Sequence, residues 1–525
     1  MGLPALVAAM LRPEMYPHRP AEVTLVQTHI SYVCIAGSEV YKIKKPVRFS
    51  FLDFSTLAQR HHFCREEVRL NRRLAPDVYL GIVAICPADT GYRLGDESDP
   101  AAVEYAVHMR RLPDDRMLDR LLAAGAATAE MIDQLALRLA EFHRQADAGP
   151  EVIANGDPAA IARVLEDNFT GMQRFRDVTI VAADDDLIQA FSRAFLQENA
   201  TLLHQRQAQR RIRDGHGDLH SEHICFADSL VIFDCIEFNR AFRYCDVASE
   251  IAFVAMDLDY HERPDLTARL IRSYAAHAQD PELPRLVPFY QCERAYVRGK
   301  VDSLKSVEEE VGEPERLAAQ QSARAHFALA YRYTWAYTPC VVVVMGLSGT
   351  GKSAVADALR RRTGFLHLNS DVVRKRLAGL TPDTRGDATL YTPERSAQTY
   401  AALLHAAADH VAGGGGVIVD ATFQRRSDRQ QVRALAASHG VPLLCVECQC
   451  SEAEVRRRLA LRERQRDSPS DADWSVYLEQ RRRYEPLTPA EEADALRLDT
   501  TAAVAHNVAA IERALRSRAQ RHAGH

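Results

Sequence analysis

Eight consecutive residues in the second half of the chain, Gly346-Leu-Ser-Gly-Thr-Gly351-Lys352-Ser353, have the spacing G-x-x-x-x-G-K-[ST]. A predicted buried strand (341–345) precedes them and a helical pattern (353–362) follows. Glycines in such a loop let backbone N–H groups surround phosphates, and the helix N-terminus adds partial positive charge. Lys352 would reach the β- and γ-phosphates, and the Ser353 hydroxyl would ligate Mg²⁺. We therefore predict a site for ATP and Mg²⁺, with a ligand-free glycine-rich turn as the alternative. Its residues are Gly346, Ser348, Gly349, Thr350, Gly351, Lys352 and Ser353.

Two acids follow predicted strands further along the chain. Asp371 comes just after the apolar run 365–369, and Asp420 ends the run Val417-Ile-Val-Asp420. Residues at the carboxyl ends of parallel strands face the ligand crevice. Asp371 is placed to accept a proton from a substrate hydroxyl, and Arg374, one helical turn later, to hold a phosphate or a substrate anion. Asp420 is placed to support Mg²⁺ or its water. A helix N-cap at Asp371 and a structural turn at Asp420 are the alternatives.

An arginine-rich helical segment at 454–466 ends before the loop Asp467-Ser-Pro-Ser-Asp471. Arginines on a mobile lid can close over a phosphoryl group in transfer. Arg458 and Arg462 are our candidates for that role, and a solvated, charge-rich helix face is the alternative. The sequence does not single out one arginine.

Residues 340–520 resemble the P-loop small-molecule kinases, a group that includes gluconate kinase, chloramphenicol phosphotransferase, polynucleotide kinases and zeta toxins. The similar features are Gly346–Ser353, Ser370-Asp371-x-x-Arg374 and the segment ending at Asp467–Asp471. The resemblance implies Asp371 as general base and Arg374 as a substrate or phosphate contact. It does not identify the acceptor.

A second group of polar residues lies in the first half of the chain. The segment Asp214-Gly-His216-Gly217-Asp218-Leu-His220-Ser-Glu-His223 is followed by the apolar run Val231-Ile-Phe233 and Asp234. In phosphoryl transfer one carboxylate orients a nucleophilic hydroxyl and another holds Mg²⁺. His-Gly-Asp by itself is equally typical of a turn.

This segment resembles the aminoglycoside phosphotransferase family, whose fold is related to that of protein kinases. The resemblance implies that His216 and Asp218 form the catalytic-loop pair, with Asp218 as base, and that Asp234 binds Mg²⁺. Asp246 resembles a structural acid of the family. The motif at 234–239, together with the fused P-loop domain, resembles an uncharacterised bacterial branch over nearly the whole chain.

The family asparagine that ligates a second metal is His223 in this sequence. Mg²⁺ prefers oxygen ligands, so an imidazole is a poor replacement. Either one metal suffices, Glu222 substitutes, or this region has lost phosphoryl transfer.

A Lys–Glu ion pair that positions phosphates is the other feature expected of such a fold. Lys42 and Lys44 share one face of the predicted strand 39–45, and Glu66 or Glu67 lies on the following helix. The loop Thr28–Ser31 would cover the phosphates, by resemblance alone. Tyr296-Val-Arg298-Gly-Lys300 is either an anion site or a solvated helix face. Because aminoglycosides are cations, their site needs clustered acids, and the sequence does not tell whether its scattered acids converge.

The elements that position these residues divide into two regions. Short β-rich runs occupy 22–48, with a hairpin predicted around Gly37-Ser38; a helix follows at 55–74 and further apolar runs lie near 79–86 and 103–109. From about 115 the pattern is mostly helical. We expect a bilobal, protein-kinase-like α+β domain at 1–305, with a small lobe at 20–110 and a helical lobe at 111–305.

An acidic break and linker helix at 306–338 separate this region from a P-loop domain at 339–520. There, β-rich runs at 340–345, 365–369, 416–420 and 442–448 alternate with helical patterns. That alternation predicts an α/β domain with a doubly wound parallel sheet. Cys445, Cys448 and Cys450 lie in an apolar run, so we interpret them as thiols on a core strand.

The composition is that of a globular protein. The 525 residues carry a formal net charge of -5, with 47% hydrophobic and 26% charged residues, which excludes a wholly disordered chain and a collagen-like fibre. The charge balance argues against a dedicated nucleic-acid binder. Without a signal peptide or a run long enough to cross a bilayer, we expect a cytoplasmic protein with no membrane partner.

These features together predict an ATP-dependent phosphotransferase with two tandem modules, each acting on a hydroxylated small molecule. Two alternatives remain. The first region is a metabolite-sensing pseudokinase that regulates the P-loop domain, or the P-loop domain is an NTPase switch with no acceptor. The oligomeric state is left open.

Overall fold

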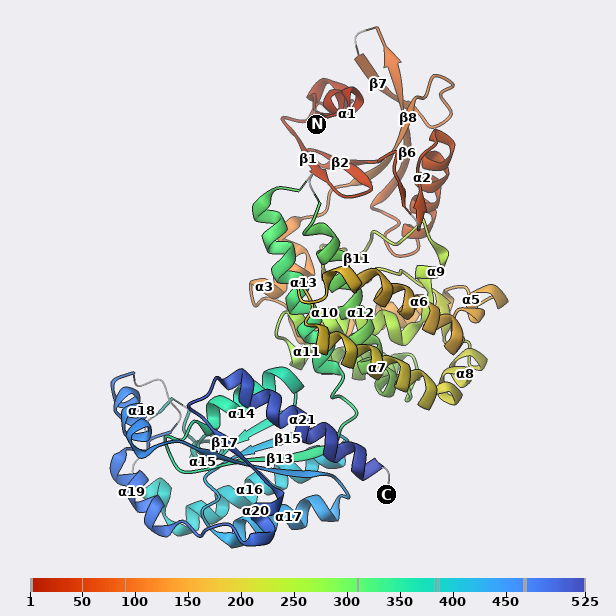
Figure 1. Cartoon of the computed structure of the whole chain (residues 1–525). Helices are drawn as coiled ribbons and strands as arrows, with labels where there is room; N and C mark the ends of the chain where they lie inside the picture. Colours follow the sequence, from red (N-terminus) through yellow and green to blue (C-terminus); the bar gives the residue numbers. More distant parts are fainter. Residues whose placement is uncertain are drawn as a thin grey trace. The chain divides into compact units, whose positions relative to one another are not determined.

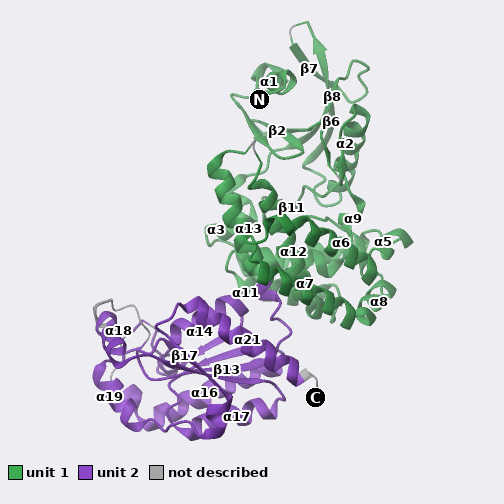
Figure 2. Ribbon diagram, in the orientation of Figure 1, with its two compact units in different colours: residues 1–330 green, residues 331–525 purple. Residues whose placement is uncertain are grey.

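The structure is a computed structural model. It describes residues 3–49, 51–89, 91–308, 311–381, 383–384, 386, 388–465 and 470–523. The predicted lid residues Arg466 and Asp467 therefore lie outside the described residues. The chain divides into two compact units, Met1–Ala330 and Tyr331–His525, which we call unit 1 and unit 2 (Figure 2).

Unit 1 begins with a six-stranded antiparallel sheet in the order β1-β2-β3-β8-β6-β7. The predicted hairpin is present, since Gly37, at φ 63°, turns the chain between β2 and β3. Helix α2 packs against β6 and β8, and its capping box at Thr56 and Gln59 fixes its start. The elements are α1 (Ala5–Met10), β1 (Val23–Gln27), β2 (Ser31–Ala36), β3 (Glu39–Lys44), β4 (Arg48–Phe49), β5 (Leu52–Asp53), α2 (Leu57–Asn71), β6 (Tyr79–Ala88), β7 (Gly91–Asp96) and β8 (Glu104–Arg110).

The rest of unit 1 is helical apart from four short strands between residues 212 and 246. Helix α10 is buried along nearly its whole length and packs against α11 and α12 (Figure 1). The elements are α3 (Leu118–Ala123), α4 (Ala129–Gln145), α5 (Pro150–Ala154), α6 (Pro158–Met172), α7 (Ala182–Glu198), α8 (Ala200–Ala208), β9 (Ile212–Asp214), β10 (Ile224–Phe226), β11 (Leu230–Ile232), α9 (Arg240–Arg243), β12 (Tyr244–Asp246), α10 (Val247–Tyr260), α11 (Pro264–His277), α12 (Leu283–Lys305) and α13 (Glu313–Tyr333).

Unit 2 is built on a five-stranded, wholly parallel sheet in the order β14-β15-β13-β16-β17. Helices α14 and α21 pack together on one face, and α16 and α17 pack on the other (Figure 1). This arrangement confirms the predicted doubly wound sheet. The elements are β13 (Cys340–Met345), α14 (Lys352–Thr363), β14 (Leu366–Asn369), α15 (Ser370–Leu377), α16 (Pro393–Ala412), β15 (Gly416–Asp420), α17 (Arg426–Ser438), β16 (Leu443–Gln449), α18 (Glu452–Gln465), α19 (Trp474–Arg483), α20 (Pro489–Asp494), β17 (Ala495–Asp499) and α21 (Val504–Ala523).

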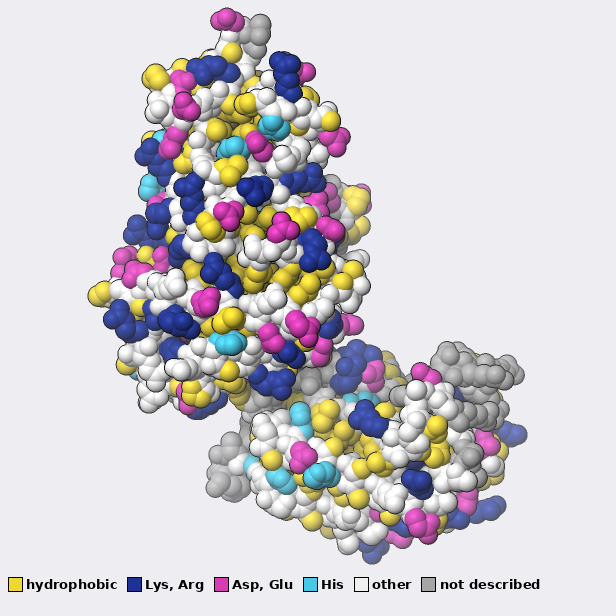
Figure 3. Space-filling model, turned by 180° about the vertical axis from the view of Figure 1, so that it is seen from behind, with side chains coloured by type: hydrophobic (Ala, Val, Ile, Leu, Met, Phe, Trp, Pro, Cys, Tyr) yellow, Lys and Arg dark blue, Asp and Glu magenta, His cyan; other side chains and the backbone are white. Residues whose placement is uncertain are grey.

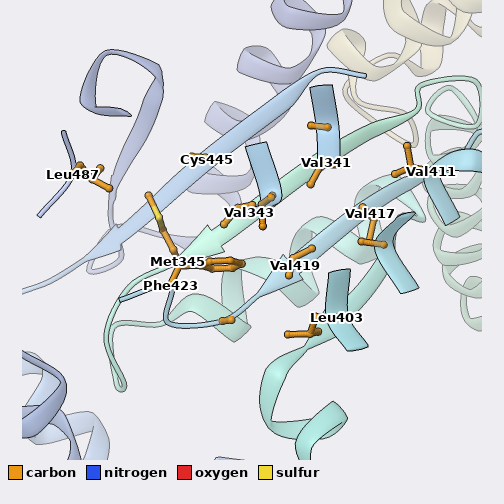
Figure 4. Close-up of a cluster of buried hydrophobic side chains, with 14 residues drawn as sticks. Val341, Val343, Met345, Leu403, Val411, Val417, Val419, Phe423, Cys445 and Leu487 are labelled. Carbon is orange, nitrogen blue, oxygen red and sulfur yellow. The ribbon is translucent and has the colours of Figure 1, made fainter. Parts of the chain in front are cut away.

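The core of unit 2 explains its apolar strands. Every residue of β13 is buried, because helices cover both faces of this central strand. Val341 and Val343 pack with side chains of β15 and α16 (Figure 4). Cys445 lies in the same cluster, and all eleven cysteines are free.

No helix among the described residues is long and apolar enough to span a membrane. On the face drawn in Figure 3, acidic and basic side chains are interspersed over both units.

Candidate functional site

The glycine-rich loop of unit 2 forms a tight turn between β13 and α14. Gly346, Gly349 and Gly351 have φ values of 143°, 81° and 88°, which glycine adopts far more readily than other residues. A Cβ atom at Gly346 would lie 2.6 Å from the Cys448 carbonyl oxygen. Lys352 Nζ donates to the Leu347 carbonyl oxygen at 3.0 Å, so the ammonium group bends back over the loop. The loop geometry is that of a phosphate-binding turn.

The carboxylate of Asp420 lies close to the start of α14. Asn369 Nδ2 donates to Asp420 Oδ2 at 2.7 Å and lies 3.4 Å from Ser353 Oγ. Burial acts to raise the pKa of Asp420, but the hydrogen bond from His367 and the charge of Lys352 outweigh it, so the pKa is lowered. Asp420 is therefore a buried carboxylate beside the hydroxyl that we expect to ligate Mg²⁺.

Asp371 and Arg374 form an ion pair on the first turns of α15. Arg374 Nη1 donates to Asp371 Oδ1 at 2.7 Å, and the guanidinium lies 4.8 Å from the centre of the Tyr391 ring. The N-cap of this helix is Asn369, whose Oδ1 accepts from the N–H groups of Asp371 and Val372. The alternative of Asp371 as the cap residue is therefore wrong.

The predicted lid arginines have different surroundings. Arg458 donates to Glu454 at 2.7 Å and to the Thr500 carbonyl oxygen at 2.7 Å. A Cβ at Gly351 would lie 2.8 Å from Arg458 Nη1, so this guanidinium lies against the loop. Burial lowers the pKa of Arg462, partly offset by Asp371. Arg458 is thus held in place by its hydrogen bonds to Glu454 and Thr500, whereas Arg462 lies near the candidate base Asp371.

These side chains line one cavity of about 1090 Å³ within unit 2. The predicted residues that line it are Ser348, Gly349, Gly351, Lys352, Ser353, Asp371, Arg374, Asp420, Arg458 and Arg462. Residues from four separate chain segments therefore converge on a single site.

Unit 1 contains a buried cluster of charges at the predicted Lys–Glu position. Glu67 pairs with both lysines: its Oε2 accepts a hydrogen bond from Lys44 Nζ at 2.7 Å, and its Oε1 forms an ion pair with Lys42 Nζ at 2.9 Å. Lys42 also contacts Asp234 at 2.5 Å, and Lys44 contacts Glu237. Burial acts to lower the pKa of Lys42, but Asp234 and Glu67 raise it. Both lysines are therefore held as cations.

The structure decides between the two glutamates. Glu66 faces away from the lysines and pairs with Arg69 on the helix surface at 2.7 Å. Glu66 is therefore wrong as the partner of the lysines and Glu67 takes that position, because one residue along a helix changes the side-chain direction by about 100°.

The predicted catalytic loop is held from behind by a buried acid. Glu250 Oε1 accepts from the backbone N–H groups of His216 and Gly217, each at 2.6 Å, and Glu250 Oε2 lies 2.8 Å from His143 Nε2. His216 Nε2 lies 2.8 Å from the Phe233 carbonyl oxygen. Burial lowers the pKa of His216 to about 4. His216 is therefore neutral near pH 7 and orients the loop through hydrogen bonds.

Asp218 and Asp234 line a cleft of unit 1, and His223 lies 3.6 Å from each of their carboxylates. His223 Nδ1 lies 2.8 Å from the Asp218 carbonyl oxygen and 3.6 Å from Asp218 Oδ2. His223 Nε2 lies 3.6 Å from Asp234 Oδ2. Burial acts to raise the pKa of Asp218, but His220 and His223 hold it well below its usual value. Donor atoms of Asp218, His220 and His223 lie within 4.8 Å of one another. These three donor atoms are close enough together to bind one metal ion.

The remaining residues predicted in unit 1 also have clear positions. Asp246 caps α10 and pairs with buried Arg206 at 2.6 Å, which is a structural contact. Burial acts to lower the pKa of Arg298, but Asp218 raises it, which places Arg298 near the candidate base. Thr28 and Lys300 line the cleft. A fully solvated helix face at 296–300 is thus excluded.

Comparison with known proteins groups the chain with mycobacterial relatives. Uncharacterized proteins of Mycobacterium tuberculosis and Mycobacterium bovis are each 30% identical to it over 441 residues, which is 83% of this chain and 85% of theirs. The chain belongs to their family. Residues 341–487 match the model of a family described as an AAA domain.

Solved structures are also similar to unit 2. A gluconokinase from Sinorhizobium meliloti is 23% identical, with a TM-score of 0.26 over 35% of this chain and 95% of its own. An APS kinase from Mycobacterium tuberculosis in complex with AMPPNP and APS is 22% identical, with a TM-score of 0.26 over 34% and 98%.

Several residues of these sites escaped the sequence reasoning. Asn369, Gln480 and Glu237 each bind a site residue: Asn369 bonds Asp420, Gln480 accepts from the Ser348 N–H at 2.9 Å, and Glu237 contacts Lys44. Gln480 and Glu237 lie far along the chain from their partners, so no local pattern indicates them. Asn369 ends an apolar run just before Asp371, and its N-cap chemistry was a usable signal.

Proposed function

We propose that unit 2 is a kinase that uses ATP and Mg²⁺ to phosphorylate a hydroxyl of a small molecule. The observation that carries the proposal is the position of the Asp371–Arg374 pair in the same cavity as Lys352 and Ser353. A P-loop alone binds nucleotide, whereas a carboxylate facing it supplies a base for an acceptor. The match of residues 341–487 to the AAA-domain family supports the nucleotide part.

The contacts of each residue support a role for it in this proposal. Lys352 leaves the Leu347 carbonyl to hold the nucleotide's terminal phosphates, and Arg374 neutralises charge on the group in transfer. Asp371 accepts the proton of the acceptor hydroxyl. Ser353, with Asp420 beside it, would hold Mg²⁺, which would supply counter-charge to the phosphates.

The test measures ATP turnover against a panel of hydroxylated metabolites. Lys352→Ala is expected to abolish turnover, since the phosphates lose their cation. Asp371→Asn is expected to lower acceptor-dependent turnover by about 10²–10⁴-fold while ATP binding persists. An NTPase switch is the competing function, and it predicts turnover that no acceptor raises and that Asp371→Asn leaves intact.

For unit 1 we propose a second nucleotide-dependent phosphotransferase module. The supporting observation is that Lys42 pairs with both Glu67 and Asp234, next to Asp218. His223, in place of a metal-ligating asparagine, favours the competing hypothesis that unit 1 is a metabolite-sensing pseudokinase. Radiolabelled ATP with a metabolite and antibiotic panel, run on the wild type, Asp218→Asn and Lys352→Ala, separates them: a sensor retains every phosphotransfer activity in Asp218→Asn.

A further inference from the structure

One wall of the cleft in unit 1 is formed by two helices that pack together, α6 and α12. Each helix turns an apolar stripe toward the cleft, with residues about one or two turns apart. The apolar residues of this wall are Ile161, Val164 and Leu165 of α6, and Val297, Val301 and Leu304 of α12. The cleft has a volume of about 910 Å³, within the range of small-molecule sites.

The cleft exposes large apolar side chains to solvent. Val164 and Val301 are 44% and 40% exposed, and Phe49, Phe51 and Phe242 on other elements are 44%, 44% and 37% exposed. All five line this cleft. Phe51 lies 5.7 Å from the Phe49 ring and 6.2 Å from the Phe242 ring. Removing such apolar surface from water is favourable, so an apolar molecule is the favoured occupant.

The two-helix wall carries few charged side chains, and they differ in whether they have an oppositely charged partner. Glu293 is the acid that the wall turns to the cleft, and it pairs with the neighbouring Arg294 at 3.4 Å. Lys300 donates to Asn168 Oδ1 at 2.9 Å and forms no ion pair with any residue that the structure describes. Burial lowers the pKa of Lys300, partly offset by Asp167. The wall therefore offers an anion a partly desolvated cation, and among the described residues of α6 and α12 that line the cleft the acid, Glu293, is already paired.

We propose that this cleft binds a small molecule with an apolar body and one anionic group, which pairs with Lys300. The apolar body covers the apolar stripes of α6 and α12. The anionic group neutralises the charge of Lys300, which its hydrogen-bond partner Asn168, being neutral, does not. The proposal concerns binding, so it holds whether or not unit 1 transfers a phosphoryl group. It excludes polycationic antibiotics as ligands of this wall.

Two fluorescent probes that differ by one anion test the proposal. 1-Anilinonaphthalene-8-sulfonate carries a sulfonate, and N-phenyl-1-naphthylamine is its neutral analogue. In the full-length protein, Lys300→Gln is expected to weaken sulfonate-probe binding about tenfold and to leave the neutral probe unchanged. Lys305→Gln, on the same helix but outside the cleft lining, is the matched control and is expected to change neither.

Further variants separate charge from shape. Lys300→Arg is expected to retain the sulfonate probe, and Val301→Asp to weaken both probes. Retained neutral-probe binding shows that Lys300→Gln is folded. Equal sulfonate affinity in the wild type and Lys300→Gln overturns the proposal, as does displacement of the probe by the polycation kanamycin.

Discussion

At the scale of single residues, two adjacent glutamates differ in what surrounds them. Glu67 is fully buried between Lys42 and Lys44, whereas Glu66 forms a surface pair with Arg69. Glu67→Gln leaves two buried ammonium groups short of an anion, so we expect the free energy of unfolding to fall by about 3 kcal/mol. Glu66→Gln is expected to change it by less than about 1 kcal/mol. Urea unfolding followed by far-ultraviolet circular dichroism measures both.

The same residue predicts a pH dependence. Burial acts to raise the pKa of Glu67, but Lys42 and Lys44 hold it below its usual value. The ionised Glu67 carboxylate thus stabilises the folded state fully above its pKa in the unfolded chain, about 4.3. This contribution is lost as the pH falls through the lower pKa of Glu67 in the folded protein. Glu67→Gln should therefore show a smaller acid-induced loss of stability than the wild type. Parallel pH profiles would contradict this assignment.

At the scale of elements, the turn from β13 to α14 depends on glycine for two reasons, backbone angle and space. Gly346→Ala places a methyl group 2.6 Å from a carbonyl oxygen at φ 143°, while Gly414→Ala meets positive φ alone, with nothing within 4 Å. We expect Gly414→Ala to cost about 1 kcal/mol and Gly346→Ala more than about 3 kcal/mol, with loss of ATP binding. Both tryptophans, Trp335 and Trp474, lie in unit 2, so their fluorescence reports its unfolding. If Gly346→Ala and Gly414→Ala lowered the free energy of unfolding equally, the backbone near the Cys448 carbonyl oxygen would have moved to make room for the methyl group.

At the scale of the whole molecule, our proposal gives the two units different groups to hold phosphates, a lysine–carboxylate cluster and a glycine-rich loop. We expect the wild type to bind two molecules of a non-hydrolysable ATP analogue. Lys352→Ala and Lys42→Ala should each retain one, because each change touches one unit. Isothermal titration calorimetry gives the stoichiometry, and a wild-type value of one, lost in Lys352→Ala, would make unit 1 a domain without nucleotide.

Much of the fold was predictable because it depends on residues that are close together in the sequence. The β2–β3 hairpin at Gly37 and the strands β13 to β16 follow from turn chemistry and from β-branched runs. Strands β7 and β17 were missed. Arg497 in β17 and Arg93 in β7 break the apolar pattern, and pairing with a neighbouring strand stabilises these segments instead.

The sequence by itself determined the glycine-rich loop, its flanking strand and helix, and the order of acids after the strands. Those features are set within a few residues by sterics and hydrogen bonding. Only the tertiary structure decided that Glu67 rather than Glu66 meets the lysines, and that Glu237, 193 residues beyond Lys44, joins them. It alone also showed that the α6–α12 wall is mostly apolar and that Lys300 is its one cation without an ion pair among the described residues. Such contacts depend on which faces pack together, and that follows from burial over the whole chain.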